Sequence, residues 1–111
     1  MLPKKNRIPR KDFPSSSQRK ANRFSSLLFS GNIYPHQGDT RVSVVVSKKI
    51  AKTAVTRNKI RRRFYSAVSP FIKDSREISI VIYPKIKTEE APFSLLKSEI
   101  GKMFSEAKFL P

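Results

Sequence analysis

The residues best suited to chemistry in this sequence are the lysines and arginines between positions 48 and 63. This segment holds eight basic residues and no acidic one. None of these charges can therefore pair with a carboxylate one helical turn away within the segment. Arginine binds phosphate through two parallel hydrogen bonds, and lysine supplies a compact positive charge. We predict that the segment binds an external polyanion, with nucleic acid as the leading candidate.

The spacing of apolar residues predicts a helix over 53–68, ended by Pro70. Its apolar side would hold Ile60, Phe64, Ala67, Val68 and Phe71. The opposite side would present polar and basic side chains, with further basic residues flanking it and approaching its start. The predicted RNA-binding residues are Lys48, Lys49, Arg57, Asn58, Lys59, Arg61, Arg62, Arg63 and Tyr65.

Groups that catalyse reactions are sparse. Hydrolysis assisted by a protein-bound metal normally requires clustered carboxylates, whereas residues 1–73 contain only Asp12 and Asp39. His36 is the single histidine, and we interpret it as an ordinary loop residue. The absence of cysteine excludes disulfides and thiol catalysis. We therefore expect no catalytic residue and no metal site in the protein itself.

Charge is divided unevenly along the 111 residues, whose formal net charge is +16. Residues 1–73 carry 18 Lys and Arg against two acids, and residues 74–111 carry six of each. The length suits a single domain over 1–111, beginning with a basic arm over 1–20. We see no apolar run long enough to span a membrane and no secretory signal, so we expect a soluble cytoplasmic protein with no membrane partner.

The remaining pattern predicts an α+β chain. Segments 23–29, 41–47 and 77–83 are expected to be strands, and 30–40, with its Gly, Pro and Asp residues, a loop. A final helix is expected to start near Thr88–Pro92. The residues expected in the core are Phe24, Leu27, Leu28, Val42, Val44, Val46, Phe93, Leu96, Ile100, Met103, Phe104 and Ala107.

One segment, VSKKIAKTAVTRNKIRRRF, carries a specific resemblance. Val46-Ser47-Lys48-Lys49 followed by Ala54-Val55 and then Arg57 to Arg62 is similar to the hallmark of the protein subunit of bacterial ribonuclease P. Within the basic arm, the stretch KKNRIPRKDF, which ends in Asp12-Phe13, also resembles that family. Three departures are Ser43 in place of the family's usual Gly, Tyr65 in place of Arg, and Ser17 in place of a second aromatic residue in the arm.

The resemblance implies a two-layer sandwich ordered α-β-β-β-α-β-α, with a mostly antiparallel central sheet and a left-handed βαβ crossover. It implies removal of the 5′ leader from precursor tRNA by a catalytic RNA with bound Mg²⁺. The protein would be a non-catalytic subunit that needs no other protein partner. It would bind that RNA through the basic helix and hold the single-stranded leader near the arm, at Phe13, Lys4, Lys5 and Arg7.

Two questions stay open at this point. Phe13 has two interpretations, since it either packs the arm onto the sheet or stacks on a leader nucleotide; Tyr34 and Phe29 are weaker candidates for the leader. The alternative function is that of a structural RNA-binding protein, such as a small ribosomal protein. A module that reads a DNA major groove fits less well, because the helix commits its apolar side to a sheet.

Overall fold

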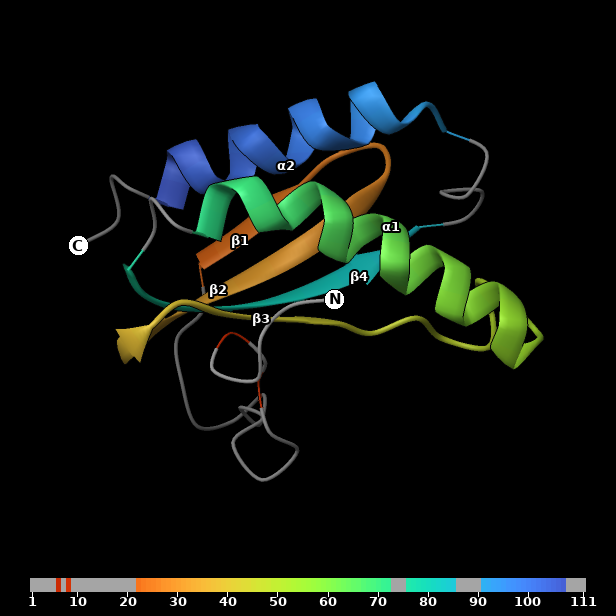
Figure 1. Ribbon diagram of the computed structural model, residues 1–111, viewed down its shortest axis with the longest axis horizontal. Helices are drawn as coiled ribbons and strands as arrows, with labels where there is room; N and C mark the ends of the chain where they lie inside the picture. The colour runs from red at the N-terminus through yellow and green to blue at the C-terminus, as the bar shows by residue number, and fades with distance from the viewer. Residues whose placement is uncertain (1–5, 7, 9–21, 73–75, 86–90, 108–111) are drawn as a thin grey trace.

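The computed structural model describes residues 6, 8, 22–72, 76–85 and 91–107. Two helices cover one face of a four-stranded sheet (Figure 1), which confirms the predicted α+β class and its two layers. The helix expected in the arm lies outside the described residues. No helix within the described part of the chain is long and apolar enough to cross a membrane. The elements are β1 (Asn22–Ser25), β2 (Phe29–Asp39), β3 (Arg41–Val44), α1 (Ala54–Ile72), β4 (Arg76–Pro84) and α2 (Phe93–Ala107).

The sheet has the strand order β1-β2-β4-β3. The β1–β2 and β2–β4 pairs are antiparallel, and β3–β4 is parallel, so the sheet is mostly antiparallel as expected. Helix α1 connects the parallel neighbours β3 and β4. With the helices above the sheet and both strands running to the right, β4 lies behind β3 (Figure 1), so this crossover is left-handed. Such a hand is rare for βαβ units.

The core lies between the sheet and the two helices. Strands contribute alternate residues to it, as the pleat requires, and α1 contributes Ile60, Phe64, Ala67 and Val68, which confirms its predicted apolar side. The core residues predicted in and just after β3 and in α2 are buried, apart from Phe93, which is 41% exposed, and Ala107, whose side chain is not among those described. The other core members are Phe24, Phe29, Ile33, Val42, Val44, Val46, Ala51, Ile80, Ile82, Leu96, Ile100, Met103 and Phe104.

Segment 30–40 is not a loop, which corrects the prediction. It forms most of β2, an inner strand that pairs with β1 on one side and β4 on the other. Gly31 and Pro35 are both within the paired region. A Cβ built on Gly31 would lie 2.9 Å from Sδ of Met103. Glycine is therefore present here because α2 packs closely onto the strand, whereas the sequence pattern resembled a turn.

Segment 23–29 is also not one strand. Within it, β1 ends at Ser25, a turn follows, and β2 begins at Phe29. The Ser26 hydroxyl accepts hydrogen bonds from the amides of Leu28 and Phe29 at 3.2 and 3.3 Å, and this local bonding stabilises the turn. Leu27 at the turn is 93% exposed, so its predicted place in the core is wrong.

Helix α1 begins close to where the pattern predicted. Thr53 precedes it, and its hydroxyl accepts a hydrogen bond from the Thr56 amide at 3.2 Å, which is the geometry of an N-cap. The predicted end at Pro70 is wrong, because the helix continues to Ile72. Tertiary packing accounts for the extension, since Phe71 stacks on Phe104 of α2 with ring centroids 5.7 Å apart. Helix α2 starts at Phe93, one residue after Pro92.

Candidate RNA-binding surface

The exposed side of α1 carries four of the nine predicted RNA-binding residues. Asn58, Lys59 and Arg62 are exposed, and Arg61 is half-buried. Lys59 and Arg62 make no side-chain hydrogen bond or ion pair within the described residues. Their charges are therefore available to an external anion. We call the set Lys48, Lys49, Asn58, Lys59, Arg61 and Arg62 the basic surface.

Asn58 and Arg61 form a pair on this surface. The Arg61 guanidinium donates a hydrogen bond to the Asn58 side-chain oxygen, one turn away on the helix. The bond holds the Arg61 side chain toward the preceding turn of the helix. A guanidinium has five N–H donors, so most of those on Arg61 have no partner within the described residues and can bind phosphate. Asn58 thus orients a cation in addition to presenting its own amide.

Arg57 makes a different set of contacts. Its Nη1 donates to the backbone oxygens of Ala51 and Lys52 at 3.0 and 3.1 Å. Both acceptors belong to the segment that connects β3 to α1, and Ala51 is buried against the core. Arg57 is half-buried and fixes this connection to the first turn of the helix. Its predicted contact with RNA stays a prediction, and its observed role is to hold this connection against the helix.

Lys48 and Lys49 lie in a turn within the same connection, and both are exposed. The amides of Ile50 and Ala51 donate to the Ser47 oxygen at 3.1 and 3.2 Å, which closes the turn. Because Arg57 fixes the end of this turn to α1, the two lysines lie beside the N-terminus of the helix. The positive end of the helix dipole adds to their charge.

Arg63 and Tyr65 contact other elements of the protein. The Arg63 guanidinium donates to the Ala91 backbone oxygen, just before α2. The Tyr65 hydroxyl accepts a hydrogen bond from the Val44 amide at 3.2 Å, at the edge of β3 that faces away from β4. Both side chains are half-buried. They hold α1 against its neighbours, and their predicted contact with RNA is not tested by these bonds.

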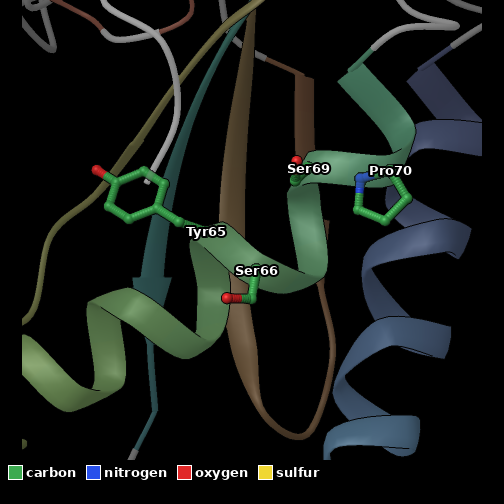
Figure 2. Close-up of a pocket in the computed structure, with 4 residues that line it drawn as sticks. All are labelled: Tyr65, Ser66, Ser69 and Pro70. Carbon is green, nitrogen blue, oxygen red and sulfur yellow. The ribbon is translucent and has the colours of Figure 1, made fainter.

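A pocket of about 340 Å³ lies on α1 next to the basic surface. Figure 2 shows the Tyr65 ring leaving the helix on one side of it, with the Ser66 and Ser69 hydroxyls and the Pro70 ring further along. Neither serine was predicted from the sequence. The helical wheel contained the signal, since Ser69 falls eleven residues after Asn58, and therefore on the same side of the helix.

The sheet face turned away from the helices carries a second, smaller cluster. Ile8 packs there with Tyr34 and Val81, and all three are buried. The Asn6 side-chain amide donates to the Thr40 backbone oxygen at 2.9 Å. Asn6 and Ile8 therefore lie against this side of the sheet. The predicted leader-binding residues Phe13, Lys4, Lys5 and Arg7 lie outside the described residues.

The outcome differs for the two weaker aromatic candidates. Phe29 is fully buried in the core on the helix side of the sheet, so it is not available to a leader. Tyr34 lies on the opposite face, as does Tyr83, which is partly exposed. Burial raises the pKa of Tyr83 above its ordinary value of 10.0, and the nearby Tyr34 raises it further. The Tyr83 hydroxyl therefore remains a neutral donor at physiological pH.

Carboxylates and histidine do not cluster in the part of the chain that the structure describes, where no three His, Cys, Asp or Glu side chains come together. The ion pair found there, between Lys102 and Glu99 at 3.6 Å, lies on α2. The chemistry of the basic surface is thus cationic and hydrogen-bonding.

Comparison with known proteins gives a consistent picture. The family model described as Ribonuclease P matches residues 2–108. The chain is similar to the ribonuclease P protein component of Pseudanabaena sp., with 26% identity over 113 residues that cover 99% of this chain and 97% of the relative. It is 38% identical to the component from Rickettsia prowazekii over 69 residues, which is 59% of this chain and 57% of that protein.

Solved structures support the fold. The ribonuclease P protein from Staphylococcus aureus superposes with a TM-score of 0.71 at 20% identity, covering 97% of this chain and 93% of that one. The protein from Thermotoga maritima superposes with a TM-score of 0.66 at 19% identity, covering 78% and 84%. At these identities the likeness establishes the α+β architecture.

Proposed function

Because the chain belongs to the ribonuclease P protein family, we propose that it binds the catalytic RNA of that enzyme through its basic surface. In this role it assists removal of the 5′ leader from precursor tRNA. The observation that carries the proposal is the exposed side of α1, where Lys59 and Arg62 have no acidic partner within the described residues. Such a surface gains affinity by displacing counterions from phosphates.

The proposal divides two RNA ligands between two faces. The catalytic RNA binds α1, and the leader of the precursor binds the sheet face against which Ile8 packs. Phe13, Lys4, Lys5 and Arg7 follow or precede Ile8 closely in the chain, which supports a leader site on that side. An aromatic residue such as Phe13 suits a single strand because every base has a face that stacks.

The proposal assigns the chemical step to the RNA. Mg²⁺ bound mainly by that RNA supplies the activation of water and the neutralisation of phosphate charge. The contribution of the protein is to bind and orient both RNAs, with no catalytic residue of its own. The basic surface suits this division, since its cations attract phosphate and its composition offers no carboxylate ligand for Mg²⁺. We also place the protein in the cytoplasm, where it acts without another obligate protein partner.

The alternative considered from the sequence, a structural RNA-binding protein of the ribosome, has no separate support. The family match extends over residues 2–108 and includes the basic surface.

One reconstitution tests the proposal. Purified protein is combined with its catalytic RNA and a precursor tRNA at limiting Mg²⁺, and the rate of leader removal is measured. We expect faster cleavage with protein than without, and no cleavage by protein alone. The matched control is a protein with Lys59 and Arg62 changed to Ala, which should fold normally and give little stimulation. Equal rates with and without the wild-type protein would contradict the proposal.

A further inference from the structure

The pocket formed by Tyr65, Ser66, Ser69 and Pro70 continues the basic surface along α1. Ser66 is one turn beyond Arg62, and Ser69 is nearly two turns beyond it. At 1.5 Å per residue, the rise from Arg62 to Ser66 is about 6 Å along the helix axis. A ligand that follows this side of the helix therefore leaves the arginines and next meets the two serines.

The chemistry changes at this point from charged to neutral. The residues that line the pocket carry three hydroxyl groups and no charge. The Tyr65 hydroxyl accepts from the Val44 amide, and its own hydrogen remains available to donate. Each serine hydroxyl both donates and accepts. The pocket is therefore suited to a neutral group that itself donates and accepts hydrogen bonds.

Pro70 leaves one backbone acceptor near the pocket without its helical donor. Within an α-helix, the amide of residue 70 would donate to the carbonyl of Ser66, but proline has no amide hydrogen. The helix continues through Pro70 to Ile72, so the Ser66 carbonyl lacks this donor. A carbonyl oxygen without its usual helical partner lies on the same stretch of helix as the Ser66 and Ser69 hydroxyls.

We infer that this pocket binds a ribose 2′-hydroxyl of the catalytic RNA. The inference rests on the proposed function, because the phosphates of the same RNA segment lie on the basic surface. A nucleic-acid strand alternates charged phosphates with neutral sugars, and the helix presents cations followed by hydroxyls in one line. The 2′-hydroxyl donates and accepts, and it is the group that distinguishes RNA from DNA. The pocket thus gives α1 a contact that selects RNA, whereas the charge of the basic surface attracts any polyanion.

The test uses full-length protein with Ser66 and Ser69 both changed to Ala. Alanine favours a helix more than serine does, so folding is preserved. The matched control changes Ser98 and Ser105, two exposed serines on α2, to Ala. Binding to the catalytic RNA is measured over a range of salt concentrations. Loss of two hydrogen-bonding groups should weaken binding by about 5- to 30-fold, with the salt dependence unchanged, while the control binds like wild type.

A second measurement identifies the sugar. Catalytic RNA with 2′-deoxy nucleotides scattered at random is separated into protein-bound and free pools. With wild-type protein, deoxy substitution at one or a few positions should lower the bound fraction. With the S66A/S69A variant, the same positions should lose their effect. The control variant should reproduce the wild-type pattern.

Three outcomes are distinguishable. An unchanged affinity of S66A/S69A, or an identical interference pattern, would overturn the ribose site while leaving the basic surface intact. A reduced salt dependence of S66A/S69A would also overturn it, since it would indicate that the pocket holds a phosphate. By contrast, an unchanged salt dependence after Lys59 and Arg62 are changed to Ala would contradict the proposed function itself.

Discussion

The hydroxyl oxygen of Tyr65 lies 3.2 Å from the backbone nitrogen of Val44 and accepts its hydrogen bond. The bond joins the middle of α1 to the edge of β3 that faces away from β4, so a residue next to the basic surface also fixes the helix to the sheet. The same side chain borders the pocket. Substitutions on this helix can therefore change both its stability and its ligand binding, and the two effects must be measured separately.

Changing Tyr65 to Phe removes this acceptor and leaves the ring in place. The Val44 amide would then lose its partner in a partly buried setting, and we expect the free energy of unfolding to fall by about 1–2 kcal/mol. Urea denaturation measures the change. Tyr83→Phe, at a partly exposed position, is the matched control and should have a smaller effect. Equal stability of Y65F and wild type would contradict the role assigned to this bond.

Arg57 and Arg62 are expected to separate stability from RNA binding. Arg57→Ala removes the bonds to the oxygens of Ala51 and Lys52, and should lower the free energy of unfolding by about 1 kcal/mol. Arg62→Ala leaves stability unchanged, because this side chain is exposed and makes no hydrogen bond or ion pair within the described residues. It should reduce the slope of log affinity against log salt by about 0.7–0.9 per lost phosphate contact. Denaturation and salt titration together measure both effects; an unchanged slope for R62A would show that Arg62 does not contact phosphate.

Gly31→Ala tests the close contact between β2 and α2. The added Cβ would lie 2.9 Å from Sδ of the buried Met103, so either the side chain or the helix must shift. We expect a loss of about 1–3 kcal/mol, the range for overpacked cores, in thermal or urea unfolding. Ser30→Ala, at the neighbouring half-buried position, controls for the strand context. A G31A protein as stable as wild type would indicate that α2 adapts freely.

The Tyr83 hydroxyl should lose its proton at a higher pH than an ordinary tyrosine does. Burial and the neighbouring Tyr34 both raise the pKa of Tyr83 above 10.0, and NMR of the labelled ring carbon across alkaline pH measures it. Since the folded-state pKa is the higher one, the unfolded chain loses this proton first, and the stability contribution declines as pH rises above about 10. Tyr34→Phe should move the pKa of Tyr83 back toward its ordinary value. A pKa at or below 10.0 in the wild-type protein would contradict this interpretation.

Phe13→Ala tests the leader site. If Phe13 stacks on a leader nucleotide, the variant should lose affinity for precursor tRNA while its affinity for mature tRNA is retained. Stacking on one base corresponds to about 1–3 kcal/mol, or roughly 5- to 150-fold in affinity. The holoenzyme is used in both measurements, so that the catalytic RNA contributes equally. An equal loss for both substrates would support packing of the arm in place of a leader contact.

Some features of this protein follow from the sequence alone because they depend on neighbours a few residues apart. The spacing of Ile60, Phe64, Ala67 and Val68 predicted which side of α1 is buried, since a 3.6-residue period leaves little choice. The absence of acids between 48 and 63 predicted an exposed cationic surface. The family hallmark, which combines those two patterns at fixed spacing, predicted the family.

Other features were decided by contacts between distant segments. Gly31 and Pro35 indicated a loop, but pairing with β1 and β4 makes their segment an inner strand. Pro70 indicated a helix end, yet the packing of Phe71 on Phe104 carries α1 past it. Arg57 looked equivalent to Arg62 in the sequence. The fold directs the Arg57 guanidinium to backbone oxygens five and six residues earlier and leaves Arg62 exposed. The path of that connection is set by tertiary packing, because Ala51 within it is buried in the core.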